Sequence, residues 1–132
     1  MAHSTVVGGS SAHRVIECPA SVGLSKNIPP APSSPYAKEG TALHYVMEQM
    51  LFADDPLERA KKFIDTEVDG VMITEDLFID KIRPAWDATQ DAFTRFDVSE
   101  YEPEGEVHFK SVEGAFGTCD IFAKGRDDLV VI

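Results

Sequence analysis

The stretch that organises this sequence is Glu39-Gly40-Thr41-Ala42-Leu43-His44-Tyr45-Val46-Met47-Glu48, which combines an apolar helical stripe with two polar side chains. His44 and Glu48 are four residues apart, so a helix of 3.6 residues per turn places both on one side. The apolar residues beside them recur at helical spacing, which predicts that one face packs into a core. We therefore expect His44 and Glu48 at the margin of the buried face. The same spacing is also typical of an ordinary half-exposed His–Glu pair.

The central helix is predicted to run from about Pro35 to Ala53, because Ser34 can cap it and proline is favoured at the first helical position. The preceding residues 27–34 are rich in proline and serine and are predicted to be a surface linker, since prolines there cannot form regular hydrogen-bonded structure. Gly40 costs the helix up to ~1 kcal/mol relative to alanine. Its presence suggests close approach of another backbone or of a ligand.

The N-terminal region is predicted to contain little regular structure. Residues 1–9 are small and polar and should form a flexible end. A short helix over residues 12–17 follows, stopped by the next proline, with Val15 and Ile16 expected to face inward. Cys18 at the end of this helix is expected to be a small buried hydrophobe.

The region after the central helix is predicted to hold two more helices. Pro56 should start a short helix that ends at Ile64, and Asp69-Gly70 signals either a small hairpin or an irregular loop. Thr74 is predicted to cap the longest helix, which Pro84 should kink or split. The core face of this long helix is predicted to consist of Phe78, Ile82, Trp86, Thr89, Phe93 and Phe96.

Beyond Val98 the hydrophobic pattern changes from a helical to an alternating period. Residues 106–110 and 118–123 alternate polar and apolar side chains, and residues 114–117 between them should form a turn. Leu129–Ile132 is apolar without alternation, which predicts a strand buried on both faces.

The order of these elements predicts an α+β or α/β fold. A helical half over residues 35–97 is followed by a three-stranded meander over residues 101–132. A length of 132 residues fits a single domain with one hydrophobic core. Because the sequence ends inside its most buried predicted strand, we expect a complete domain to continue past Ile132.

Composition restricts the classes of function. The formal net charge of -11 argues against a protein that coats nucleic acid through charge alone, yet a nuclease whose carboxylates hold divalent cations is compatible with it. The two cysteines, Cys18 and Cys119, indicate neither a disulfide framework nor a zinc knuckle. No apolar run approaches the ~20 residues of a membrane helix, so we expect a cytoplasmic protein without a membrane partner.

Asp120 lies within the predicted strand over residues 118–123, where an ionised carboxylate is costly unless it is paired or bound to a cation. Asp120 either points outward on the same face as Thr118 or faces the helix that carries His44 and Glu48. In the second case, carboxylate oxygens, a neutral imidazole nitrogen and water would suit Mg²⁺ or Mn²⁺. We would then expect the side chains of His44 and Asp120 to converge, with Glu48 near them.

These motifs together resemble a known class of enzymes. Gly40-Thr41-x-x-His44 on a helix, followed by Gly117-Thr118-x-Asp120 on a strand and then a buried strand, is similar to RecB-type members of the PD-(D/E)XK nuclease superfamily. Ser10-Ser11-Ala12-His13-Arg14 with Cys18-Pro19, together with Glu39-Gly40-Thr41-Ala42-x-His44, resembles in particular a family of phage and prophage proteins known only as a domain of unknown function. The resemblance covers Ser10 to Ile132 and implies an incomplete restriction-endonuclease-like core.

The resemblance implies specific roles for four residues. His44 and Asp120 would be the catalytic residues that ligate Mg²⁺ or Mn²⁺, and Glu48 and Glu106 would assist them as further metal ligands. The implied activity is that of a divalent-metal-dependent DNA nuclease, an exonuclease of phage recombination or repair in the cytoplasm of a bacterial host. The implied partners are DNA and either a second copy of the chain or another phage recombination protein.

The sequence also departs from the pattern of these nucleases. Their acid-x-lysine motif, which completes the metal site and activates water, directly follows the last apolar strand, whereas this sequence ends at Ile132. We therefore expect an N-terminal portion of a nuclease that is inactive alone. Some relatives use a cysteine before proline as one of four iron-sulfur ligands; Cys18 matches it, but the three later cysteines are missing, so no cluster is expected. The alternative is a non-catalytic nuclease-fold phage protein that binds DNA or a host protein.

Overall fold

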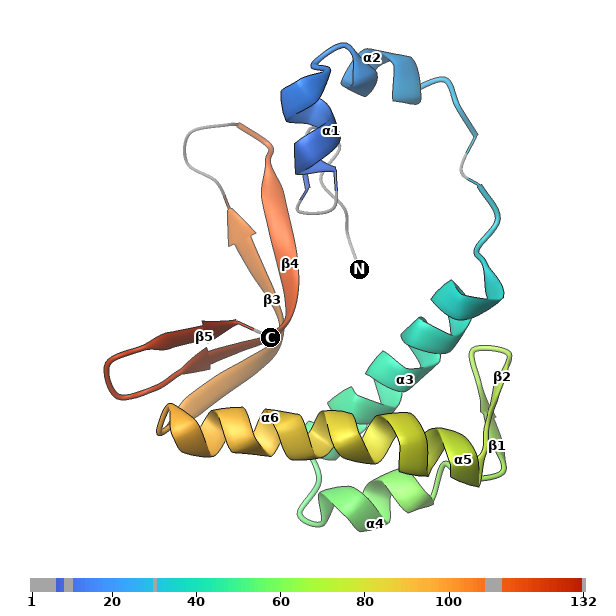
Figure 1. The fold of residues 1–132 in the computed structure, drawn as a ribbon, viewed down its shortest axis with the longest axis vertical. Coiled ribbons are helices and arrows are strands. Elements are labelled where there is room, and N and C mark those ends of the chain that lie inside the picture. The colour runs from blue at the N-terminus through green and yellow to red at the C-terminus, as the bar shows by residue number, and fades with distance from the viewer. Residues whose placement is uncertain (1–6, 9–10, 30, 109–112, 132) are drawn as a thin grey trace.

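The computed structural model describes residues 7–8, 11–29, 31–108 and 113–131. The chain combines helices with two small antiparallel sheets in a mixed α+β fold (Figure 1). Helices come first and a three-stranded meander comes last, which is the order predicted from the hydrophobic periods. In the described part of the chain, no helix is both long enough and apolar enough to cross a membrane.

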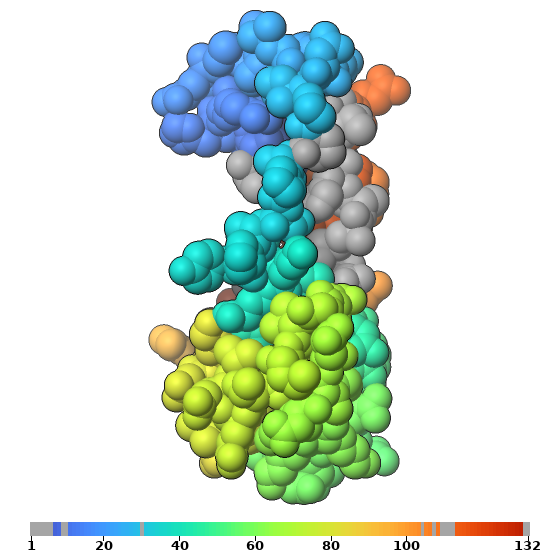
Figure 2. Space-filling view, turned by 90° about the vertical axis from the view of Figure 1, so that its right-hand side faces the viewer, coloured from blue at the N-terminus to red at the C-terminus, as the bar shows by residue number. Residues whose placement is uncertain are grey.

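The N-terminal region forms two short helices, α1 (Ala12–Glu17) and α2 (Ser21–Ser25), and neither contains a buried residue. Ile16 is 80% exposed and Cys18 is exposed, so the predictions that Ile16 faces inward and that Cys18 is buried were wrong. Helices of five or six residues present too little apolar surface to anchor themselves on a core. In Figure 2 they form a lobe at the top, away from the lobe of the later helices at the bottom.

The expected flexible end over residues 1–9 lies outside the described residues except for Val7 and Gly8. Gly8 is held by the start of α1, because its backbone N–H donates to the Ser11 hydroxyl at 3.0 Å. The backbone N–H of Ser11 in turn donates to the Gly8 carbonyl, also at 3.0 Å.

The central helix is α3 (Pro35–Leu51), and its start is as predicted. The Ser34 hydroxyl accepts a hydrogen bond from the backbone N–H of Ala37 at 3.1 Å, and proline occupies the first turn. At the other end, the Tyr101 hydroxyl donates to the Leu51 carbonyl at 2.7 Å, which ties the helix to the sheet. The buried residues recur at helical spacing and are Ala42, Val46, Met50 and Leu51.

A short helix and a hairpin follow. Helix α4 (Pro56–Lys61) begins at the predicted proline and ends three residues before Ile64. Strands β1 (Thr66–Val68) and β2 (Val71–Ile73) form an antiparallel hairpin, which decides between the two interpretations left open for this segment. Its turn is Asp69-Gly70, both with positive φ, 49° and 78°, the conformation that Asp-Gly turns favour.

The long helical run comprises α5 (Glu75–Leu77), the π-helical segment η1 (Phe78–Ile82) and α6 (Arg83–Arg95). Thr74 caps it as predicted, with its hydroxyl accepting from the Leu77 N–H at 3.2 Å. Pro84 lacks an N–H, and its ring would clash with the carbonyl four residues earlier in a regular helix. The π turn immediately before α6 accommodates this conflict, so the predicted interruption near Arg83 is confirmed.

The predicted core stripe of the long helix is confirmed in its first part. Phe78, Ile82, Trp86 and Thr89 are 1–8% exposed. Phe93 and Phe96 are only half-buried and pack at the margin of the core. The core cluster combines side chains of α3, α4, the hairpin, the long helix and the larger sheet, so one hydrophobic core holds helices and strands together.

The larger sheet is a meander of β3 (Glu100–His108), β4 (Phe116–Lys124) and β5 (Leu129–Val131), in the order β3-β4-β5. Both pairs are antiparallel, with Gly105 opposite Cys119 and Ala123 opposite Val130. The first strand starts earlier than predicted and tolerates Pro103 because β3 is an edge strand.

Two details of the predicted strands were wrong. The turn before β4 ends ahead of Phe116, so Gly117 is part of the strand; residues 109–112 lie outside the described chain. Strand β5 is not buried on both faces, because Val130 is 9% exposed whereas Leu129 is 63% exposed. An edge strand of three residues packs through one face, and apolar sequence alone does not show where a strand lies in its sheet.

Neighbouring isoleucines on η1 provide a matched test of this core. Ile82 is 1% exposed and Ile79 is 54% exposed. Ile82→Ala should lower the free energy of unfolding by about 2–5 kcal/mol, because it removes buried methyl groups and leaves a cavity. Ile79→Ala should change it by no more than about 0.5 kcal/mol. Reversible urea titration of both variants measures the difference, and equal effects would contradict the packing described here.

Candidate functional site

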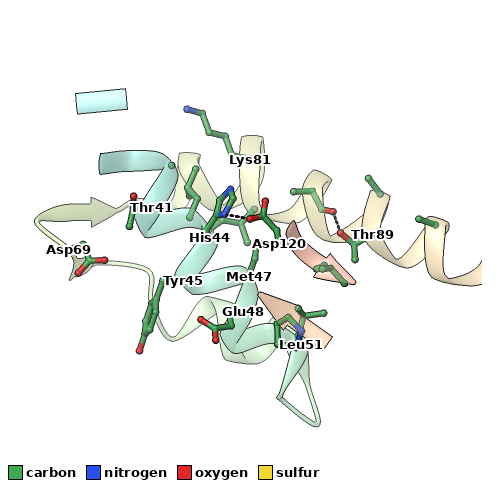
Figure 3. A pocket seen from close by; sticks show the side chains of 18 of the residues that line it. Thr41, His44, Tyr45, Met47, Glu48, Leu51, Asp69, Lys81, Thr89 and Asp120 are labelled. Atoms are coloured by element: carbon green, nitrogen blue, oxygen red, sulfur yellow. Dashed lines mark hydrogen bonds and ion pairs between the residues drawn. The ribbon is translucent and has the colours of Figure 1, made fainter. Parts of the chain in front are cut away.

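The described residues form a cleft between α3, the η1–α6 run and β4, with a volume of about 1180 Å³ (Figure 3). Helix α3 lines it with residues one helical turn apart, including Ala37, Thr41 and His44. The long helix contributes small residues at the same kind of spacing, Ala85, Ala88 and Ala92. We refer to this hollow below as the cleft.

His44 and Asp120 meet in the cleft, although they lie far apart in the sequence. His44 Nδ1 is 3.2 Å from Asp120 Oδ1, and the two side chains are 55% and 51% exposed. Figure 3 shows them pointing toward each other from α3 and β4. The predicted convergence is confirmed, and Asp120 faces the helix rather than extending away from it.

Local sequence explains why both side chains reach the cleft. On α3, Leu51 is 8% exposed, and His44 lies two helical turns before it, at the edge of the buried face. On β4, Ile121 is 5% exposed, and because side chains alternate along a strand, Asp120 leaves the sheet on the opposite face. The pair is thus held by buried neighbours while remaining accessible to water.

The two predicted helper residues are placed differently. Glu48 lines the cleft, but Figure 3 shows its side chain one turn further along α3 and directed away from the His44–Asp120 pair. Glu106 is not among the residues that line the cleft, and its carboxylate lies 2.6 Å from His108 Nε2. Among the described residues, no group of three His, Cys, Asp or Glu side chains is arranged to hold a metal ion.

One of the two roles expected for Gly40, close approach of another backbone segment, is not observed in the described part of the chain. Among the described residues, a side-chain carbon added there would meet nothing within 4 Å, so no other described backbone segment approaches it closely. Gly40 instead lines the cleft one turn before His44. The missing side chain keeps this end of the cleft open, which leaves the ligand interpretation of Gly40 untested.

The charges around the cleft are mostly negative. Asp69, Glu48 and Asp120 line it, and Lys81 is the one lysine or arginine among the described lining residues. Lys81 forms an ion pair with Glu39 on α3. Lys81 and the alanines of α6 were not predicted from the sequence to line a site. The spacing of those alanines, on the polar side of the helix, was a signal for a second contact face.

The distance between the two site residues fits shared coordination of a small divalent cation. Adjacent ligands of an octahedral Mg²⁺ or Mn²⁺ ion are about 3 Å apart when each bond is about 2.1 Å long. The observed 3.2 Å between His44 Nδ1 and Asp120 Oδ1 is close to this value. An imidazole nitrogen and a carboxylate oxygen are also suitable donors. Two protein ligands leave most coordination positions to water, substrate or further residues.

Comparison with known proteins assigns the family. Residues 3–132 match the model of a family described as protein of unknown function (DUF2800). The chain belongs to the DUF2800 family. No solved structure matches it. The description of DUF2800 assigns no activity to its members. The relation to RecB-type nucleases and the phage origin therefore stay predictions. The chemistry of this DUF2800 site follows from its residues alone.

The site of this DUF2800 chain should be separable from its stability. His44 and Asp120 are half-exposed, and ion pairs of this kind contribute little to folding. Asp120→Asn and His44→Gln should therefore each change the free energy of unfolding by less than about 1 kcal/mol. Reversible urea titration of both variants tests this, with Ile82→Ala as a destabilised reference. A loss as large as that of the reference would show that the pair is structural.

Proposed function

We propose that this DUF2800 chain forms part of a divalent-metal-dependent DNA nuclease of the PD-(D/E)XK type, in which His44 and Asp120 hold Mg²⁺ or Mn²⁺. The activity would be that of an exonuclease in phage recombination or repair. The observation that carries the proposal is the 3.2 Å approach of His44 Nδ1 to Asp120 Oδ1 across the helix–sheet interface. Two short motifs that are individually common converge on one point in the fold.

Two further features support a cation site over a simple ion pair. Both side chains are half-exposed in a cleft rather than on a convex surface, so a ligand can reach them. The surrounding carboxylates also favour a cation electrostatically.

In this proposal, each residue has a defined task. His44 donates the lone pair of one neutral imidazole nitrogen, and Asp120 supplies negative charge at the same point. The bound cation would lower the pKa of an attacking water and stabilise charge that develops on the phosphate. Burial of Val46 and Ile121 keeps the two ligands in place while phosphate approaches from the open side of the cleft.

A non-catalytic alternative is favoured by a different observation. The described residues supply His44 and Asp120 but no third ligand to the same point, whereas an acid-x-lysine pair after β5 would complete the nuclease site. A nuclease fold without that pair would bind DNA or a protein rather than cleave DNA. The two readings share the fold and differ in whether phosphodiester bonds are broken.

The first test measures metal binding by the chain itself. Titration of Mn²⁺, with the free ion measured by electron paramagnetic resonance, should show one weak site. Asp120→Asn and His44→Gln should each weaken it by about tenfold or more, because each removes a ligand. Matched controls are Asp128→Asn, an exposed aspartate in the turn before β5, and His13→Gln, an exposed histidine on α1. Binding that all four variants reduce equally, or none does, would refute the assignment.

The second test measures cleavage of labelled linear duplex DNA with Mg²⁺ or Mn²⁺. The chain of 132 residues should be inactive, and a protein in which an acid-x-lysine segment follows Ile132 should cleave. Asp120→Asn should abolish that cleavage. Cleavage by the 132-residue chain would place the catalytic groups elsewhere, whereas a folded, inactive extended protein would support the binding alternative.

A further inference from the structure

Lys81 is the one lysine or arginine among the described residues that line the cleft, and its neighbours in the long helix fix its position there. It belongs to η1, in which Phe78 is 6% exposed and Ile82 is 1% exposed. Because these two side chains are anchored in the core, the backbone of Lys81 is held at the wall of the cleft. Its side chain remains 49% exposed. Single π-helical turns of this kind are frequent at functional sites.

The ammonium group of Lys81 is held by a carboxylate at the rim of the cleft. It forms an ion pair with Glu39 Oε1 on α3, and Glu39 is not among the residues that line the cleft. The Glu39 side chain is 28% exposed, the lowest value for a carboxylate in the ion pairs of the described residues. Figure 3 shows Lys81 beside the His44–Asp120 pair, with its amine directed away from that pair.

The other charges of the cleft would repel a DNA phosphate. Glu48, Asp69 and Asp120 line the cleft, and each carries negative charge when ionised. A divalent cation at His44 and Asp120 would offset part of this charge, but a phosphodiester adds a negative charge of its own. Like charges in a partly desolvated cleft repel strongly. A second positive group is therefore needed where phosphate enters, and Lys81 is the candidate in the described part of the chain.

Lys81 can exchange one anion for another without movement of the backbone. A lysine side chain is a compact ammonium on a flexible four-carbon stem, so it can turn from the rim into the cleft. Its present contact is a half-exposed lysine–carboxylate pair, a type that contributes little to stability. A hydrogen bond from ammonium to phosphate is charge-assisted and stronger than a neutral one. Binding of DNA can therefore displace Glu39 from Lys81.

The sequence around Glu39 leaves space for such an exchange. Glu39 directly precedes Gly40, which lines the cleft one helical turn before His44. A side-chain carbon at Gly40 would meet no described atom outside its own stretch of helix within 4 Å. A larger residue at this position would narrow the cleft next to the carboxylate that holds Lys81.

We propose that Lys81 contacts a backbone phosphate of DNA in the cleft and that Glu39 competes with this phosphate for the lysine. The inference rests on the proposed function, because it takes DNA as the ligand of the cleft. In the chain without DNA, Glu39 holds the ammonium at the rim. When DNA binds, the ammonium moves from the carboxylate to a phosphate oxygen. Glu39 thus acts as a positioning residue that lowers the affinity for DNA through Lys81.

The test is equilibrium binding of labelled linear duplex DNA by the whole chain, measured by fluorescence anisotropy with Mn²⁺ over a range of low salt concentrations. Lys81→Gln should weaken binding by about tenfold and lower the salt dependence by about one counterion, because one phosphate contact is lost. Glu39→Gln should strengthen binding by about two- to fivefold, because it releases Lys81. In the Lys81→Gln background, Glu39→Gln should have no further effect.

The matched control is a second lysine–glutamate pair outside the cleft. Lys61 Nζ lies 2.5 Å from Glu58 Oε1 on α4, the side chains are 52% and 60% exposed, and neither residue lines the cleft. Lys61→Gln and Glu58→Gln change the net charge exactly as the two test substitutions do. Each should alter the affinity for DNA by less than about twofold, since it removes no phosphate contact.

Several outcomes would overturn this contact. They are equal effects in the control pair, a gain from Glu39→Gln that persists without Lys81, and no measurable DNA binding by the unaltered chain. The Mn²⁺ titration contains no DNA, so it decides the cation site of His44 and Asp120 independently. Normal Mn²⁺ binding together with unchanged DNA binding by Lys81→Gln would refute the lysine contact alone. Circular dichroism shows whether every variant is folded.

Discussion

The structure depends on the burial of one stripe of α3 against the other elements. Val46 and Met50 are fully buried, and they belong to the same core cluster as Ile82 of the long helix and Ile121 of β4. Because protein interiors are close-packed, these contacts fix the rotation of α3 relative to the sheet. The position of His44 beside Asp120 follows from that rotation. The site is therefore set by apolar packing, and its own polar contact contributes little to holding it together.

The interrupted long helix is the second constraint. Pro84 cannot complete a regular helical turn, and the chain accommodates it through the π turn of η1 rather than by ending the helix. The stripe of Phe78, Ile82 and Trp86 remains on the core across this turn. Alanines at other positions of α6 lie along the cleft, where larger side chains would fill it. One helix thus provides both the core and a wall of the cleft.

Charge is distributed unevenly along the chain. Residues 1–38 contain three lysines or arginines and one acidic residue, whereas residues 39–132 contain nine and 22. The described residues after 38 contain the hydrophobic core, while neither α1 nor α2 contains a buried residue. This division explains why the net charge of -11 is a poor guide to the surfaces of the chain. The acidic total is compatible with the cation that we propose for the cleft, and Arg14 and Lys26 are not among the residues that line it.

The sequence by itself determined the elements whose signals are local. Ser34-Pro35 specified the start of α3, Thr74 capped the long helix, Asp69-Gly70 favoured a hairpin turn, and the change of period after Val98 predicted the meander. Local capping and turn chemistry decide these features without distant contacts. Spacing placed His44 at the edge of a buried face, and motif order suggested that Asp120 would meet it.

Only the tertiary structure decided which surfaces are covered. Ile16 and Leu129 have apolar sequence contexts, yet both are exposed, because burial depends on what packs against a segment rather than on its own composition. Glu48 has the spacing of a partner for His44, but its side chain is directed away from the pair, since residues four apart are rotated as well as stacked. The cleft, Lys81 and the alanine wall of α6 arise from the packing of two helices distant in sequence, which no local pattern specifies.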